Sequence, residues 1–444
     1  MPRASQGRVV FVGIALVYLL IIIQRAFFSN LTDFDIFYTA SQHFLHHQSI
    51  YLPVDWGAFP HIRALPPILQ QHFVLSPNLN PPGFSLLTMW LSLLPFSVAY
   101  ILWVGLLLLC GWWSVRLVGE QKEFYPLSPM LLAAAFFLAY PVVRGIAIGQ
   151  LGVALMLVLL FALRAFQREQ WKKAAVILGV LAGFKLFCGM FVFIFLFRRE
   201  WRALQLFVLS FVLTFSLPVF IFGVKVYQEY FYILQHIYWY ASTNNASLYG
   251  FLTRVFGGST VKPLIDAVGP AVLAYGVAIA LGVYWIYRTI RQYPENILPP
   301  FLLTIVLMLW LSPLAWLYYC PILLIVFLYV LPRYPRFKFS LGTFFYGRAY
   351  LASVLLLNLP FTLNLPLGEV PASFVFGKNS CYFYGLTGLL VLLLSSFNVK
   401  EEDYMLPNSL RPTIIGTLYF SLTGLYSLSL ILTHLIFFAK VIYA

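Results

Sequence analysis

The chain has 444 residues, of which 61% are hydrophobic and only 9% carry a charged side chain. A soluble domain carries about 25% charged residues, so this composition excludes a soluble globular protein. The net charge of +14 comes from short Lys and Arg clusters between apolar segments, which is typical of membrane topology and argues against a nucleic-acid partner. We expect an all-α polytopic membrane protein with roughly eleven to thirteen transmembrane helices of about 20 residues each.

The first apolar segment, residues 9–28, follows Arg3 and Arg8 and lacks a small-residue cleavage site, so we expect a retained helix with a cytoplasmic N-terminus. Residues 29–82 then form a large extracytoplasmic loop. Within it we expect short interfacial helices at residues 34–45 and 62–73. After it, residues 84–94 lean into the outer leaflet and residues 99–117 cross inward.

The next segments are oriented by charge. Residues 131–143 run outward and residues 151–165 return, so the connection between them lies at the outer face. Residues 174–197 are only about one span long, yet basic clusters flank both ends. We therefore predict a helical hairpin that turns at residues 183–185 and carries Lys185 toward the membrane interior, where discontinuous helices occur only if protein or a cavity surrounds them.

Residues 204–224 cross outward to a second outer loop, residues 225–262. Spans at residues 266–287, 299–311 and 319–330 follow, with an outer turn at residues 312–316. Three further segments are expected at residues 350–363, 383–394 and 414–437. We divide the chain into a core, residues 1–335, and C-terminal helices, residues 336–444, of no assigned role.

Polar residues outside the basic clusters are few, and acids at a membrane boundary are costly to hold there, which makes them functional candidates. Asp33 and Asp35 lie in an aromatic, apolar run just after the first helix. A carboxylate can act as a general base toward a hydroxyl, and cations can neutralise a leaving phosphate. The candidates for contacts to phosphate or sugar are Arg144, Gln150, Lys185, Asn245, Arg254 and Tyr319.

Simpler explanations remain open for these residues. Arg144 and Lys185 can instead be side chains that extend to the membrane interface, and Gln150 can be an ordinary residue at a helix start. Neither the four cysteines nor the seven histidines show metal-ligand spacing. We expect no metal site and no cofactor.

Several stretches together resemble glycosyltransferase family 87 of the C superfamily, which includes bacterial polyprenyl-phosphate-mannose-dependent mannosyltransferases. The stretches span about residues 9–335. They are Asp33-Phe-Asp-Ile-Phe-Tyr38 with Ala40, Ile50-Tyr51, Asn80-Pro-Pro82, Gly149-Gln150, Gly179 to Lys185 followed by Arg198-Arg-Glu-Trp201, Asn245-Ala-Ser-Leu-Tyr-Gly250 with Arg254, and Ser312-Pro313 with Trp316.

The resemblance implies a hexosyltransferase in the bacterial plasma membrane with its active site on the extracytoplasmic face. Asp33 matches the family's catalytic base, with Asp35 as second candidate. The partners implied are a polyprenyl-phosphate sugar donor, mannose first, a lipid or glycan acceptor, and membrane lipids. The chain departs from the family pattern in carrying Tyr318 and Tyr319 where His often follows the Ser-Pro-x-x-Trp stretch. The alternatives are a transporter or flippase of a lipid-linked saccharide and a noncatalytic scaffold.

Overall fold

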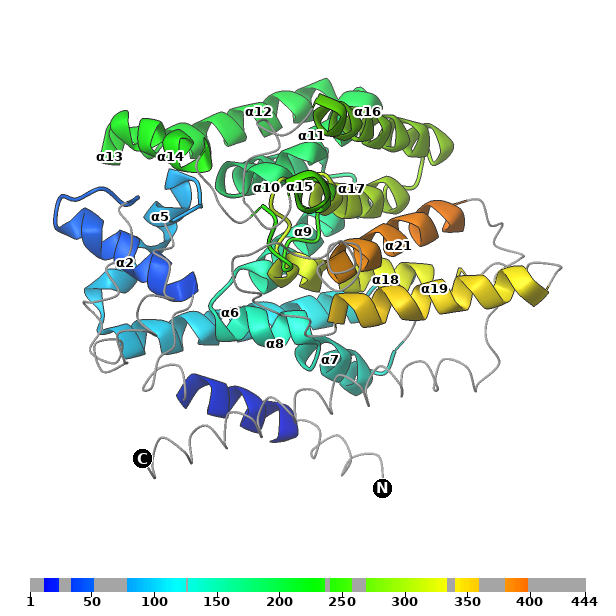
Figure 1. The fold of residues 1–444 in the computed structure, drawn as a ribbon, viewed down its shortest axis with the longest axis horizontal. Helices are drawn as coiled ribbons and strands as arrows, with labels where there is room; N and C mark the ends of the chain where they lie inside the picture. The colour runs from blue at the N-terminus through cyan, green and yellow to red at the C-terminus, as the bar shows by residue number, and fades with distance from the viewer. Residues whose placement is uncertain are drawn as a thin grey trace.

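The computed structural model describes residues 12–23, 33–51, 78–124, 127–235, 240–257, 269–333, 340–358 and 380–397. Within these ranges all the regular secondary structure is helical, apart from one isolated β-bridge between Asn245 and Trp316. The chain is therefore an all-α polytopic membrane protein, as expected (Figure 1). The helices predicted at residues 62–73 and 414–437 lie outside the described residues.

Three described helices are long and apolar enough to cross a membrane: Phe96–Gly119 (α6), Trp201–Phe222 (α12, Trp201–Ser216, with α13, Val219–Phe222) and Gly269–Gln292 (α16). A fourth candidate is the pair α7 (Pro129–Phe137) and α8 (Tyr140–Ala147), which is bent by 58° and has the length and composition of a broken span or a re-entrant loop. The remaining apolar helices are shorter: Val12–Ile23, Pro82–Leu93, Gly152–Gln167, Leu186–Arg198, Leu298–Trp310, Leu317–Val330 and Cys381–Ser396.

Several segments expected to be continuous spans are thus short or interrupted, and the larger expected number of spans stays a prediction. The segment predicted as one helix at residues 131–143 is the clearest difference, because it breaks between α7 and α8. Pro141 at the start of α8 explains the break, since proline fits the first turn of a helix but not its interior.

The basic clusters meet at one end of the molecule. Glu120, just after α6, lies 3.6 Å from Arg116 and 3.3 Å from Arg164. Nearby, Arg333 donates to the Glu123 carbonyl oxygen at 3.1 Å. Arg116, Arg164 and Arg333, from three separate basic clusters, thus lie near one another, and we call this part of the molecule the basic end.

At the other end, at the left of Figure 1, α2 (Asp33–Leu45) and α14 (Lys225–Gln235), both in segments predicted to be extracytoplasmic, lie together with α5 (Pro82–Thr88) and α13. Tyr51 and Tyr230 pack ring to ring there at 5.7 Å, joining the two expected outer loops. The helix α6 connects the two ends. Its 24 residues span about 36 Å, from Phe96 beside Tyr38 to the basic end.

The hairpin predicted around Lys185 is present. It consists of α10 (Trp171–Phe184), the 3-10 helix η3 (Leu186–Phe191) and α11 (Val192–Arg198). The end of α11 comes back to the beginning of α10, as shown by the Arg198 guanidinium, which lies 5.9 Å from the centre of the Trp171 ring. On one face of α10, Gly179 and Gly183 bring the backbone against α12. A Cβ atom at Gly179 would lie 2.4 Å from the Phe207 carbonyl oxygen.

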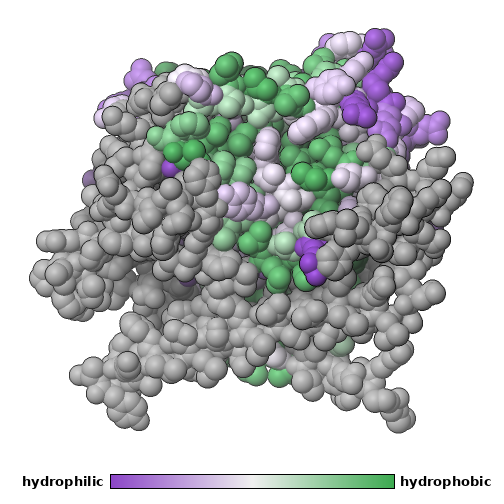
Figure 2. All heavy atoms as spheres, turned by 45° about the vertical axis from the view of Figure 1, so that its right-hand side comes forward, coloured by the Kyte–Doolittle hydropathy of each residue, from purple (hydrophilic) through white to green (hydrophobic). Residues whose placement is uncertain are grey.

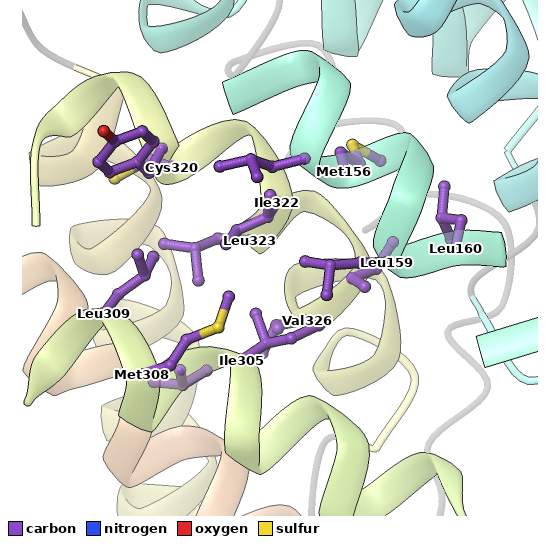
Figure 3. Packing of buried hydrophobic residues seen from close by; sticks show 14 of the residues in the cluster. Met156, Leu159, Leu160, Ile305, Met308, Leu309, Cys320, Ile322, Leu323 and Val326 are labelled. Atoms are coloured by element: carbon purple, nitrogen blue, oxygen red, sulfur yellow. The ribbon is translucent and has the colours of Figure 1, made fainter. Parts of the chain in front are cut away.

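The apolar core lies where α9 (Gly152–Gln167) meets α17 (Leu298–Trp310), the 3-10 helix η5 (Leu317–Leu323) and α18 (Leu324–Val330) (Figure 3). Side chains from all four elements interdigitate there: Met156, Leu159, Leu160, Ile305, Met308, Leu309, Cys320, Ile322, Leu323 and Val326. On the face seen in Figure 2, the described residues are apolar over a broad area, and most hydrophilic residues gather at the upper right. Such a surface suits contact with lipid.

Four further described helices belong to the end opposite the basic end or to the C-terminal part of the chain. They are the 3-10 helix η2 (Met89–Leu93), α15 (Leu248–Gly257), α19 (Ser340–Asn358) and α21 (Cys381–Ser396). In the C-terminal part, α21 packs against α17 and α19, and Trp310 donates to the Thr387 hydroxyl at 3.0 Å. The division at residue 335 into core and C-terminal helices is not tested by these contacts and stays a prediction.

Candidate functional site

Asp33 is the first residue of α2, and the residue that follows it fixes its position. The Phe34 N–H donates to the Ile148 carbonyl oxygen at 2.9 Å. The Phe34 ring is fully buried among the rings of Phe96, Tyr100 and Trp103. These contacts hold the start of α2 against the end of α8.

Gly149 permits this close approach. Its φ is +78°, in the left-handed region that favours glycine, and a Cβ atom there would lie 2.7 Å from the Phe34 Cβ. The next residue, Gln150, donates from Nε2 to Oδ2 of Asp33 at 2.6 Å. The Gly149-Gln150 pair therefore supplies both the space and the hydrogen bond that orient the Asp33 carboxylate.

The electrostatics of Asp33 reflect opposing effects. α2 is not among the candidate membrane spans, and enclosure by the protein raises the pKa of the Asp33 carboxyl above its ordinary value. The hydrogen bond from Gln150 and the charges of Arg144 and Lys185 act in the opposite direction, but burial is the larger effect. A raised pKa increases the basicity of the carboxylate, which suits a general base.

Asp35 lies on another face of α2. Its side chain is buried and does not line the cavity that Asp33 faces. The two carboxylates therefore have different surroundings despite being two residues apart, as the helical period requires.

Lys185 lies at the tip of the hairpin, at the break between α10 and η3. Its ammonium donates to the Asn80 side-chain oxygen at 2.5 Å and to the Tyr319 hydroxyl at 3.0 Å. It also lies 5.4 Å from the centre of the Phe84 ring and 5.2 Å from that of Tyr319. These neutral partners hold the buried cation without neutralising it.

Asn80 is in turn held by its own neighbours. Its side-chain amide donates to Oδ1 of Asn78 at 3.0 Å, and Asn78 donates to the Ser85 hydroxyl at 3.0 Å. The Tyr51 hydroxyl donates to the Asn80 backbone carbonyl at 2.8 Å. Asn80 was not among the predicted site residues, although it lies in the Asn80-Pro-Pro82 stretch that carries the resemblance.

Arg144 projects from the last turn of α8, within hydrogen-bonding range of the Tyr318 side chain and within electrostatic range of Asp33. The adjacent backbones are very close. A Cβ atom at Gly152 would lie only 1.8 Å from the Tyr318 carbonyl oxygen. Glycine at the start of α9 is therefore what allows the Tyr318 segment to reach Arg144.

These side chains open onto one cavity of about 650 Å³. It brings together five of the predicted site residues: Asp33, Arg144, Gln150, Lys185 and Tyr319. Polar and aromatic residues that were not predicted as site residues also line it: Asn80, Tyr230, Tyr240, Asn244, Trp316 and Tyr318. Much of the remaining wall is apolar, including Leu186, Met190 and Met308.

Asn245 and Arg254, the other two predicted substrate contacts, do not line this cavity. Asn245 is fully buried and holds together the turn at residues 312–316. Its amide donates to the carbonyl oxygens of Tyr240 and Pro313, each at 2.9 Å, and its side-chain oxygen accepts from the N–H groups of Ser247 and Ala315.

The Arg254 guanidinium is occupied by a different set of partners. It donates to the Ser242 carbonyl at 2.8 Å, to the Asn245 carbonyl at 3.2 Å and to the Ser380 hydroxyl at 3.2 Å. Arg254 thus ties α15 to the start of α21. Its Nη2 atom is buried with no hydrogen-bond partner among the described residues, and Arg254 stays a predicted substrate contact outside this cavity.

Among the described residues, no group of three or more His, Cys, Asp or Glu side chains is arranged to hold a metal ion. The cavity instead combines one carboxylate with two basic side chains. Such a set can remove a proton from a hydroxyl and bind an anionic group.

The chain is thus an all-helical membrane protein in which an acid and two cations face one cavity. Residues 78–313, more than half of the chain, match the family model of glycosyltransferase family 87. The chain belongs to this family, and the resemblance noted in its sequence is confirmed. No curated protein and no solved structure matches the chain.

Proposed function

We propose that the 650 Å³ cavity is the active site of a hexosyltransferase. The donor is a polyprenyl-phosphate-linked sugar, and mannose is the first candidate for that sugar. The acceptor is a lipid or envelope glycan, and the reaction takes place on the extracytoplasmic face of a bacterial plasma membrane. The observation that carries the proposal is the shared cavity, in which the Asp33 carboxylate faces the same space as Lys185 and Arg144. Family membership makes the chain a glycosyltransferase, and the residues of the cavity suggest how it works.

Asp33 is the proposed general base. Its carboxylate takes the proton of the acceptor hydroxyl while the acceptor oxygen forms a bond to the anomeric carbon of the sugar. The bond between that carbon and the phosphate oxygen breaks, and its electron pair leaves with the polyprenyl phosphate. Attack from the face opposite the leaving group inverts the anomeric centre. Gln150 orients the carboxylate through its 2.6 Å hydrogen bond.

Lys185 and Arg144 are the proposed phosphate-binding residues. The phosphate gains negative charge as the sugar leaves, and fixed cations in an enclosed site stabilise that charge more strongly than water does. Tyr319 and Asn80 hold the Lys185 ammonium in place. Tyr319 therefore has a role that does not require the proton-carrying ability of a histidine.

The apolar part of the cavity supports a lipid-linked substrate. Leu186, Met190 and Met308 line it, and Leu186 is also exposed on the surface of the molecule. A polyprenyl chain needs such an apolar route between the membrane and the polar site.

The test is transfer of radiolabelled mannose from polyprenyl-phosphate mannose into a bacterial lipid extract by the purified protein. Asp33→Asn keeps the shape of the side chain but removes the base, and is expected to lower the rate by about 10²- to 10⁴-fold. Asp35→Asn is the matched comparison and is expected to retain most of the activity. Full activity of Asp33→Asn, or absence of transfer from any polyprenyl-phosphate sugar, would contradict the proposal.

A transporter or flippase for a lipid-linked saccharide was the alternative. Such a protein is expected to have paired broken helices in two related halves. The α7–α8 pair is a second broken segment, in addition to the Lys185 hairpin, and the sequence analysis did not predict this second break. Membership of a glycosyltransferase family nevertheless favours catalysis over transport.

A further inference from the structure

A second cavity, of about 570 Å³, lies between α9 and α10 at the basic end, outside the candidate active site. The two helices form its walls and are joined by the tight turn at residues 168–170. Its lining residues are Val158, Phe161, Arg164, Ala165, Arg168, Gln170, Lys173, Val176, Ile177 and Val180.

Each wall changes from apolar to cationic along the helix. On α9 the apolar residues Val158 and Phe161 precede Arg164 and Arg168, at spacings that keep all four near one helix face. On α10 the order is reversed, so that Lys173 lies at the basic end and Val180 lies deepest. The apolar stretch from Lys173 to Val180 is about 10 Å long at 1.5 Å per residue.

The charge of this cavity is only partly compensated. Arg164 is 3.3 Å from Glu120, the one acidic partner that a lining residue has in the part of the chain described by the structure. Arg168 and Lys173 form no salt bridge there. The rim thus presents two uncompensated cations above an apolar groove. Phe161 and Val176 in its walls are exposed, at 43% and 41%.

We infer that this groove binds an anionic phospholipid of the leaflet at the basic end. Arg168 and Lys173 contact the headgroup phosphate, and one acyl chain lies along Phe161, Val176 and Val180. A headgroup phosphate matches the cations at the rim, and part of an acyl chain matches the apolar character of the walls. A soluble phosphate would leave the apolar walls without a partner. The inference does not depend on the sugar-transfer mechanism.

The test is native mass spectrometry of the purified full-length protein with phosphatidylglycerol or phosphatidylcholine. The wild type is expected to retain phosphatidylglycerol in preference to phosphatidylcholine. The double variant Arg168→Gln/Lys173→Gln is expected to weaken phosphatidylglycerol retention on the order of tenfold, because two headgroup cations are lost. The matched control is Arg288→Gln/Arg291→Gln, which removes two exposed cations of α16 outside the groove and is expected to behave like the wild type.

A second variant tests the apolar wall. Val176→Trp keeps every charge but fills the groove, and is expected to weaken phosphatidylglycerol retention as well. Equal retention by the Arg168→Gln/Lys173→Gln variant and the wild type would overturn the inference, as would an equal loss in the α16 control. Competition by soluble glycerol phosphate as effective as that by the lipid would also overturn it. So would a dimer that the groove variant dissociates, since the groove would then be an interface between copies.

Discussion

Gln150 donates a hydrogen bond from Nε2 to Oδ2 of Asp33 at 2.6 Å, joining residues that are 117 positions apart in the chain. This contact depends on Gly149, whose left-handed backbone lets the α8–α9 connection pass against Phe34. The hydrogen bond favours the charged carboxylate and so opposes the effect of burial, which raises the pKa of Asp33. Gln150 therefore helps to keep the proposed base unprotonated.

Replacing Gln150 by leucine is expected to raise the pKa of Asp33 further, because a group that lowers it is removed while burial remains. A base works only when unprotonated, so activity is lost as the pH falls through the pKa of Asp33. The acid limb of the pH dependence of kcat/KM should therefore move to higher pH in Gln150→Leu. On the alkaline side of that limb we expect a smaller loss, within about tenfold.

Gln121→Leu provides the matched control for this measurement. Gln121 hydrogen-bonds to Gln167 at the basic end, far along α6 from Asp33, and the same substitution there should leave the acid limb in place. An unchanged acid limb in Gln150→Leu would show that Asp33 is not the group that titrates in catalysis.

The sequence predicted the Lys185 hairpin because the apolar segment at residues 174–197 is long enough for one crossing but has basic clusters at both ends. A single crossing would place one of these clusters on the extracytoplasmic side, against the positive-inside rule. It also predicted that Asp33, Arg144 and Lys185 act on one substrate, and these residues share a cavity. It did not predict the hydrogen bond between Gln150 and Asp33. That contact depends on how two distant segments pack.

Asn245 and Arg254 illustrate the limit of the same reasoning. A buried polar residue in a membrane protein can serve chemistry or can satisfy backbone groups, and both uses produce the same sequence pattern. Only the partners distinguish them, and here most partners of both side chains are backbone groups: carbonyls and N–H groups for Asn245, and carbonyls for Arg254. In contrast, Asn80 was recognisable as part of a motif, but its hydrogen bond to Lys185 spans 105 residues and has no local signal.

Lys185→Met is expected to lower kcat/KM for the lipid-phosphate donor by about 10²- to 10³-fold, because it removes a fixed cation where charge develops in the transition state. Tyr319→Phe should have a smaller effect, within about tenfold, since it removes one hydroxyl that holds Lys185 and leaves the ring over the ammonium. Initial rates at varied donor concentration measure both effects.

Lys225→Met is the control for charge alone, because Lys225 is highly exposed on α14 and pairs with Glu229 there. It should leave the kinetics unchanged. If Lys225→Met and Lys185→Met reduce kcat/KM equally, then overall charge rather than a site at Lys185 governs donor use.

Asn245→Ala is expected to destabilise the protein by roughly 2–4 kcal/mol, because it leaves buried carbonyl and N–H groups without partners. The affected groups belong to Tyr240, Ser247, Pro313 and Ala315. Asn244→Ala is the matched control. Its side chain is only partly buried, and its stability should stay within about 1 kcal/mol of the wild type. Unfolding in detergent measures both, and a stable Asn245→Ala protein with impaired donor binding would return Asn245 to the site.

Gly152→Ala tests the close approach that brings the Tyr318 segment to Arg144. The added Cβ atom would lie 1.8 Å from the Tyr318 carbonyl oxygen, so the start of α9 and the Tyr318 segment must move apart. We expect a loss of about 1–3 kcal/mol in stability together with reduced sugar transfer, since the overlap lies beside the candidate site.

Gly276→Ala is the matched control on α16, where a Cβ atom meets nothing within 4 Å. Alanine favours a helix over glycine, so this control should melt at the same or a higher temperature than the wild type. Thermal melting and transfer assays on both variants decide the point. A Gly152→Ala protein as stable and active as Gly276→Ala would mean that the Tyr318 segment does not need this contact to reach Arg144.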